Sequence, residues 1–153
     1  MLEIIHLSNR PDFIVHVTKW LWHEWGAPEN EDFFKDLVEK GLNKKDIPQF
    51  FIALLDAKLV GTVALLRNDL KSRQDLYPWL ACLFVDVDYR SKGIGIMLQN
   101  FAIKQTKSLG YDNLYLFTDL EDYYEKSGWE FIGTGCTYSG EYVRLYKMEL
   151  HNT

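Results

Sequence analysis

Six consecutive residues in the second half of the chain have the types and the spacing of an anion-binding turn: Arg90, Ser91, Lys92, Gly93, Ile94 and Gly95. The unbroken apolar run before them, residues 79–85, has the length of a strand that is buried on both faces. After them, apolar residues recur at helical spacing as far as Leu109, and Gly110 then ends the helix. The turn therefore lies between a buried strand and the start of a helix.

Phosphate binding is the chemistry that such a turn offers. The backbone N–H groups of the first helical turn point outward, with the positive end of the helix dipole behind them. Gly93 and Gly95 lack the Cβ that would hold a phosphate away, while Arg90 and Lys92 add positive charge. The sequence therefore predicts a ligand with a pyrophosphate or several phosphates, although a Gly-x-Gly turn can also precede a helix for packing reasons alone.

A second motif follows after one predicted helix and one predicted strand. Two aromatic residues, Tyr123 and Tyr124, stand before a Glu-Lys-Ser-Gly-Trp turn that ends at Trp129. Together the two motifs resemble those of the GNAT superfamily of N-acyltransferases. The family's acyl-coenzyme A loop, Gln/Arg-x-x-Gly-x-Gly/Ala, is met by residues 90–95, and its aromatic pair before a Glu-Lys-x-Gly-aromatic turn is met by residues 123–129.

The resemblance covers about residues 58–150 and implies an N-acetyltransferase that uses acetyl-coenzyme A (acetyl-CoA) as co-substrate and needs no metal. The turn at residues 90–95 would hold the diphosphate. Strands 79–85 and 114–118 would splay apart, so that backbone groups of Phe84, Val85 and Val87 bond the pantetheine arm and one N–H faces the thioester carbonyl.

The resemblance also points to Tyr124 as the general acid that protonates the departing thiolate, with Tyr123 packing beside it. A phenol with its ordinary pKa near 10 is protonated at neutral pH, as a proton donor must be. A core tyrosine with a satisfied hydroxyl is the structural alternative.

The general base is harder to place, because many family members carry a glutamate on the strand before the loop and residues 79–85 contain no carboxylate. Ordered water, Glu24 or Asp86 are the alternatives. Where the family often has an asparagine after the splayed strand, this chain has Thr118 and Asp119, which leaves the contacts at that end of the pantetheine arm open.

Composition narrows the class of protein. The 153 residues, 47% of them apolar and 25% charged, suit a single domain over residues 1–153. The net charge of −5 argues against a general nucleic-acid or anionic-membrane binder and leans slightly toward a cationic or neutral substrate. No apolar run reaches the ~20 residues that span a bilayer, and the first ten residues do not resemble a signal peptide. We expect a cytoplasmic protein.

Cysteines and histidines give little sign of further chemistry. Cys82 and Cys136 are an isolated pair, which is usually reduced in a cytosolic chain. The four histidines are scattered, and no cysteine or carboxylate cluster completes a metal site with them, so we expect them to face solvent. They are His6, His16, His23 and His151.

Hydrophobic periodicity predicts an α/β fold of the GNAT type: a mixed, mostly antiparallel central sheet, splayed at the cofactor site, with helices on both faces. The expected strands are residues 2–7, 50–55, 59–66, 79–85, 114–118, 129–138 and 142–150, and the expected helices end at residues 25, 40, 109 and 127. In the first helix Ile14, Val17 and Leu21 form the core stripe. Trp22 and Trp25 point elsewhere, toward neighbouring loops or as a wall of the acceptor site.

Three classes of function are open to this sequence. The leading one is an N-acetyltransferase in which a primary amine attacks acetyl-CoA directly in a ternary complex. The second is a non-catalytic acyl-CoA sensor or interaction module of the same fold, and a nucleotide-binding protein is disfavoured because the turn lacks Lys-Ser/Thr. The acceptor, a small-molecule or protein amine, would lie against the first two helices, residues 67–77 and the last hairpin loop. A monomer and a homodimer are both compatible with the sequence.

Overall fold

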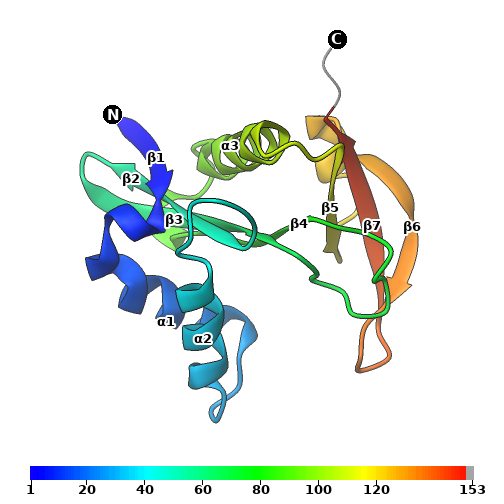
Figure 1. Cartoon of the computed structure of the whole chain (residues 1–153), viewed down its shortest axis with the longest axis horizontal. Coiled ribbons are helices and arrows are strands. Elements are labelled where there is room, and N and C mark those ends of the chain that lie inside the picture. Colours follow the sequence, from blue (N-terminus) through cyan, green and yellow to red (C-terminus); the bar gives the residue numbers. More distant parts are fainter. Residues whose placement is uncertain (151–153) are drawn as a thin grey trace.

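The computed structural model describes residues 1–150 as a seven-stranded sheet flanked by three α-helices (Figure 1). The strands are β1 (Leu2–His6), β2 (Gln49–Leu55), β3 (Lys58–Leu66), β4 (Trp79–Val85), β5 (Asn113–Thr118), β6 (Glu130–Cys136) and β7 (Tyr142–Glu149). The α-helices are α1 (Ile14–Trp25), α2 (Glu31–Lys40) and α3 (Ile94–Ser108). Single 3-10 turns are η1 (Leu7–Asn9), η2 (Pro11–Phe13), η3 (Val87–Tyr89) and η4 (Tyr124–Ser127). No helix in residues 1–150 is long and apolar enough to cross a membrane.

The sheet is mixed and mostly antiparallel, as the sequence predicts. Its strand order is β1-β2-β3-β4-β5-β7-β6, and β4 with β5 is the parallel pair. The two hairpins also form as expected, β2 with β3 and β6 with β7. The first of them turns at Asp56 and Ala57, which both have positive φ, as a two-residue hairpin of the primed type requires.

Helices cover both faces of the sheet, which confirms the predicted layering. Figure 1 shows α3 on one face and the α1–α2 pair on the other. The core on the α3 side includes Ile94, Leu98 and Ala102, and the core on the opposite side includes Val17 and Leu21 of α1. Because β2 and β3 are buried on both faces, they carry nearly continuous apolar runs.

Trp22 and Trp25 of α1 differ from one another in their surroundings. The Trp22 indole N–H donates to the Ala27 carbonyl oxygen at 2.6 Å, so this side chain packs against the loop that follows the helix. Trp25 is 51% exposed and lines a cavity described below.

The helix expected up to residue 127 is the main error of the sequence analysis. Only one 3-10 turn, η4, forms there, and bends at residues 119 and 121–123 precede it. Asp122 has a φ of 57°, a left-handed conformation that interrupts a right-handed helix. The Thr118 hydroxyl accepts a hydrogen bond from the Leu120 N–H at 3.1 Å, and this local bond competes with helix formation. His151 lies outside the described residues.

The long connection between β3 and β4 is fixed at several points. Leu70 is buried, and the Ser72 hydroxyl donates to the Cys136 carbonyl oxygen of β6 at 2.6 Å. The Asn68 side chain donates to the Arg73 carbonyl oxygen at 3.1 Å and accepts from the Gln74 amide at 3.2 Å. These contacts hold the segment across the end of the sheet.

Helix α3 approaches β3 closely at Gly61, where an added Cβ would lie 3.0 Å from a methyl carbon of Leu98. Leu98 is fully buried and its neighbour Met97 is 47% exposed. Substitutions at these two positions therefore distinguish the effect of core packing from that of a surface change. We expect Leu98→Ala to lower the free energy of unfolding by about 2–5 kcal/mol and Met97→Ala to change it by less than about 0.5 kcal/mol. Urea unfolding of the two variants measures both effects; equal losses would contradict the packing described here.

Candidate functional site

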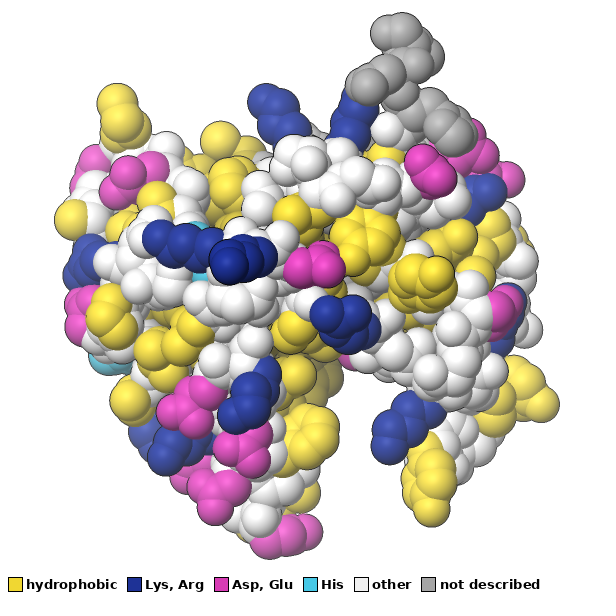
Figure 2. All heavy atoms as spheres, in the orientation of Figure 1, with side chains coloured by type: hydrophobic (Ala, Val, Ile, Leu, Met, Phe, Trp, Pro, Cys, Tyr) yellow, Lys and Arg dark blue, Asp and Glu magenta, His cyan; other side chains and the backbone are white. Residues whose placement is uncertain are grey.

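A cavity of about 830 Å³ opens where β4 and β5 part. These two strands share one aligned pair, Trp79 with Tyr115, and beyond it the cavity is lined by the middle of β4, the end of β5, Tyr124 and the segment after β3. Residues of α1 and α2 form the opposite wall. Figure 2 shows the surface hollowed between the α1–α2 lobe and the β6–β7 hairpin.

Cys82 marks the irregularity that bends β4 at the cavity. Its φ is 53°, and the register between β3 and β4 slips between Thr62 and Ala64, where β4 carries an extra residue. A bulge of this kind twists the strand and re-aims its side chains. Burial, with the Asp69 carboxylate nearby, raises the pKa of the Cys82 thiol, so the thiol is protonated at neutral pH and is a poor nucleophile.

Tyr124 projects into this cavity from η4. Its ring is buried and packs edge-on against Tyr123 and Trp129, with centroid distances of 4.9 and 6.2 Å. Burial, and secondarily the neighbouring Tyr123, raises the pKa of Tyr124 to about 12. Within residues 1–150 its hydroxyl makes no hydrogen bond, so it is a neutral donor that faces the cavity.

The turn that carries Tyr124 is tied to β7 and to α3. The Tyr146 hydroxyl donates to a Glu125 carboxylate oxygen at 2.9 Å, and the Arg144 Nε donates to the Tyr146 hydroxyl at 2.9 Å. The Trp129 indole N–H donates to the Gln99 side-chain oxygen at 3.2 Å. Glu125 and Trp129 of the second motif therefore fix the position of the turn that carries Tyr124.

The turn before α3 has the geometry expected of an anion site. Ser91 and Gly93 have φ values of 64° and 83°, and the first helical hydrogen bond runs from the Met97 N–H to the Gly93 carbonyl oxygen at 3.1 Å. No side chain caps this helix N-terminus, so the earlier amides have no intrahelical partner. Arg90, Ser91 and Lys92 are exposed, and Ile94 is buried in the core.

The residues just before the turn lie at the end of β4. Arg90 Nε donates to the Val85 carbonyl oxygen at 2.8 Å, and its guanidinium lies 5.4 Å from the Phe84 ring centroid. That carbonyl is therefore engaged within the protein. Val87 is exposed and belongs to η3, beyond the end of the strand, so Phe84 and Val85 are the two of the three expected pantetheine contacts that lie on the splayed strand.

Neither carboxylate considered as a base lines the cavity. Glu24 is exposed on α1, and the Asp86 carboxylate accepts the Asp88 N–H at 3.2 Å. Asp69, which the sequence analysis did not single out, does line the cavity. Burial raises its pKa to about 7. In the sequence Asp69 is simply an acidic residue in the connection after β3. Asp75 in the same connection has the same character, so the sequence does not distinguish the two.

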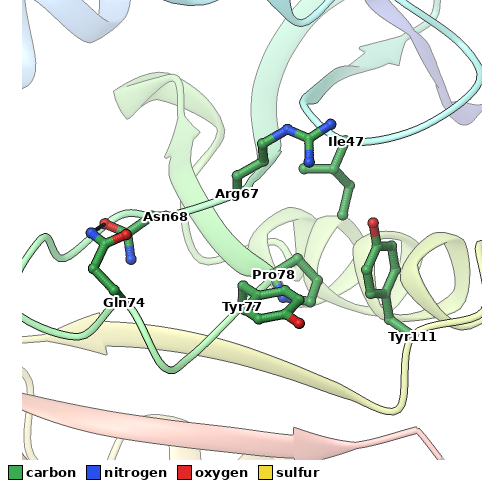
Figure 3. A pocket seen from close by; sticks show the side chains of 7 residues that line it. All are labelled: Ile47, Arg67, Asn68, Gln74, Tyr77, Pro78 and Tyr111. Atoms are coloured by element: carbon green, nitrogen blue, oxygen red, sulfur yellow. Dashed lines mark hydrogen bonds between the residues drawn. The ribbon is translucent and has the colours of Figure 1, made fainter.

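Thr118 and Asp119 also line the cavity, at the position where the family often has an asparagine. A second, smaller cavity of about 250 Å³ lies on the other side of the β3–β4 connection. Figure 3 shows Arg67, Tyr77 and Tyr111 around it. Its lining does not include Tyr124. The turn before α3 lines neither cavity, and Tyr124 is the residue of the two motifs that lines the larger one.

Among residues 1–150 no group of three or more histidine, cysteine or acidic side chains could hold a metal ion. His16 and His23 are exposed, as expected. His6 is instead held in place by a hydrogen bond between its Nε2 and the Asn43 carbonyl oxygen at 2.8 Å. Cys82 and Cys136 are both free thiols.

Comparison with known proteins agrees with these features. The profile of the "Acetyltransferase (GNAT) family" matches residues 14–129. A sequence comparison with curated proteins finds no match. Among solved structures, an aminoglycoside 6'-acetyltransferase type Ii superposes with a TM-score of 0.74 at 22% identity, covering 100% of this chain and 99% of its own.

Two further structures have the same fold. An aminoglycoside 6'-N-acetyltransferase complexed with coenzyme A gives a TM-score of 0.74 at 18% identity over 99% of this chain and 98% of its own. The aminoglycoside 6'-N-acetyltransferase from Enterococcus faecium gives a TM-score of 0.75 at 19% identity, covering 100% of this chain and 98% of its own. The chain belongs to the GNAT acetyltransferase family and is an acetyl-CoA-dependent N-acetyltransferase.

Gly95 offers a test of the turn before α3, because an added Cβ would have as its nearest neighbour a Val85 methyl carbon at 3.9 Å. Gly93 is less suitable, since its φ of 83° strains any other residue. We expect Gly95→Val to leave the melting temperature nearly unchanged and to weaken coenzyme A binding at least tenfold, about 1.4 kcal/mol. Calorimetric titration measures the affinity, and unchanged affinity in the folded variant would exclude this turn as the diphosphate site.

The effect of burial on the pKa of Asp69 can be tested through the pH dependence of stability. Its raised folded-state pKa means that the folded protein holds this proton more tightly than the unfolded chain does, so stability is lost as pH rises from about 4 to about 7. Asp69→Asn removes that loss. We expect the variant to match the parent below about pH 4 and to be increasingly more stable than the parent up to about pH 7, by urea unfolding at each pH.

Asp75 supplies the matched control with the opposite sign. The Arg73 guanidinium donates to both Asp75 carboxylate oxygens at 3.0 and 2.9 Å and lowers the pKa of this carboxyl. Asp75→Asn should therefore lower stability slightly at neutral pH, where Asp69→Asn raises it. The same pH trend in both variants would show that burial of Asp69 is not its cause.

Proposed function

We propose that the protein transfers the acetyl group of acetyl-CoA to the primary amine of a small molecule, by direct attack of the amine in a ternary complex. The observation that carries this proposal is the Tyr124 hydroxyl, which is buried, neutral and without a hydrogen-bond partner in residues 1–150, in a cavity between the parted strands. A cavity of about 830 Å³ has room for a thioester and an amine together, which favours direct attack over a relay through the enzyme. Cys82, with its raised pKa, is unsuited to form an acyl-enzyme.

In this proposal acetyl-CoA lies along β4 with its diphosphate on the turn at residues 90–95. The exposed N-terminal amides of α3 and the Lys92 side chain would bind the diphosphate. Backbone groups of Phe84 and Val85, apart from the Val85 carbonyl that Arg90 engages, would bond the pantetheine amides. The β4–β5 ladder is absent beyond Trp79, which supports this arrangement because strand-edge groups there need partners.

Tyr124 would act as the general acid. Its position in the cavity and its pKa of about 12 keep the proton on the phenol at neutral pH. The thiolate would take up this proton as the C–S bond breaks, and the phenolate would be reprotonated as the amine loses its second proton.

A small-molecule acceptor is supported by the likeness to aminoglycoside acetyltransferases and by the cavity volume of about 830 Å³, which lies in the range of small-molecule sites. The first experiment measures release of coenzyme A thiol across a panel of primary amines, with mass spectrometry of the products. Binding of acetyl-CoA without acetylation of any amine would favour the sensor alternative.

Tyr124→Phe tests the acid. We expect the acetyl-CoA dissociation constant to stay within about twofold, since one oxygen and little volume are removed, while kcat falls by ~10²-fold or more. Tyr123→Phe is the matched control, because Tyr123 packs against Tyr124 but does not line the cavity, and its kcat should not change. Normal kcat in Tyr124→Phe would transfer the acid role to bound water.

A further inference from the structure

The acceptor end of the cavity has an aromatic wall. Trp25 of α1 and Phe33, Phe34 and Leu37 of α2 line it. Phe33 is 62% exposed and Trp25 51%, although large aromatic side chains are costly to leave in water. Both belong to the two helices that also border the hollow seen in Figure 2. This wall suits a ligand with an apolar, planar body.

One carboxylate on the facing side has no partner. Asp69 makes no hydrogen bond or ion pair within residues 1–150, whereas Asp75 in the same connection is held by Arg73. The hydrogen bonds of Asn68 to Arg73 and Gln74, together with buried Leu70, fix the backbone on both sides of Asp69. The carboxylate is therefore positioned by the fold and left available to a ligand.

The other titratable groups that line the cavity are few. They are Lys71 on the same connection, Cys82 on β4, Asp119 after β5 and Tyr124. Cys82 and Tyr124 are neutral at neutral pH because burial raises the pKa of both. Burial is the cause that raises the pKa of Asp69 to about 7, so this carboxyl exchanges its proton near neutral pH.

We propose that this end of the cavity binds an arylalkylamine, with the aromatic ring against Trp25 and Phe33 and the amine at Asp69, which acts as the general base. The inference rests on the proposed function. Asp69, which lies in the connection after β3, takes the place of the carboxylate that β4 lacks. A polycationic acceptor is disfavoured, because the cavity offers two carboxylates, Asp69 and Asp119, and an otherwise largely apolar wall.

Asp69 accepts one proton from the ammonium group, and the freed nitrogen lone pair forms the C–N bond with the acetyl carbonyl carbon. The C–S bond breaks with its electron pair going to sulfur, and Tyr124 gives its proton to that thiolate. The second nitrogen proton returns to the Tyr124 phenolate through solvent, and Asp69 releases its proton to solvent. The products are the acetylated amine, coenzyme A thiol and one proton.

The test compares 2-phenylethylamine with kanamycin, a polycationic aminoglycoside, in the parent, Asp69→Asn, Phe33→Ala and the control Asp75→Asn. We expect the parent to acetylate 2-phenylethylamine with a kcat/KM at least tenfold above that for kanamycin. Asp69→Asn should lower kcat/KM at least ~10²-fold and abolish the rise in rate through about pH 7. Phe33→Ala should raise KM several-fold at unchanged kcat, and Asp75→Asn should behave as the parent.

A binding measurement gives a readout independent of turnover. Calorimetry with coenzyme A present measures the affinity for each compound. The affinity of Asp69→Asn for 2-phenylethylamine should be at least tenfold lower than that of the parent. Its affinity for 2-phenylethanol, which has the same ring but no amine, should stay within about twofold of the parent value. A parent that prefers kanamycin overturns the substrate class. Unchanged rate and pH profile in Asp69→Asn overturn the base, while a parent that acetylates no amine overturns the proposed function itself.

Discussion

β4 and β5 run side by side in parallel, yet they are aligned only at Trp79 and Tyr115. Trp79 holds this closed end: it is fully buried, its ring lies 6.1 Å from that of Tyr115 and 6.3 Å from that of Phe117, and its indole N–H donates to the Leu76 carbonyl oxygen at 2.6 Å. Beyond this point the bulge at Cys82 turns β4 away. Two strands that do not complete a ladder leave room between them for the cavity that Tyr124 lines.

The rest of the structure keeps that opening in shape. α3 packs closely on β3 at Gly61, so the start of the helix is held next to the end of β4. On the other side of the opening, Glu125, Arg144 and Tyr146 link η4 to β7 and hold Tyr124 in the cavity. The turn before α3 and Tyr124 thus belong to elements anchored in separate parts of the core, which gives them a fixed relation.

Burial sets the proton chemistry of the cavity more than charge does. Desolvation is the first cause of the raised pKa values of Asp69, Cys82 and Tyr124. An acid and a base can therefore coexist in one apolar site: the phenol is held neutral well above neutral pH, and the carboxyl is shifted to the range in which it can exchange a proton with an amine.

The amino-acid sequence by itself determined the local elements and both motifs. Hydrophobic periodicity placed the strands and α1, α2 and α3 near their observed positions, since one buried face per element is a local property. It failed at residues 120–127, where the left-handed Asp122 prevents the expected helix. The residue types of the turn before α3 and of the aromatic pair indicated an acyl-CoA-dependent transferase because those motifs are contiguous in the chain.

Only the tertiary structure decided which distant side chains share the cavity. Asp69 and Asp75 look alike in sequence, yet Asp75 pairs with its near neighbour Arg73 while Asp69 lines the cavity. Trp22 and Trp25 are likewise neighbours on α1, yet Trp22 donates to the nearby Ala27 carbonyl oxygen and Trp25 lines the cavity. The local pairs belong to short stretches of chain, but the surroundings of Asp69 and Trp25 come from β4, β5 and η4, which are far away in the chain. The burial that shifts the pKa of Asp69 therefore exists only when these elements have packed.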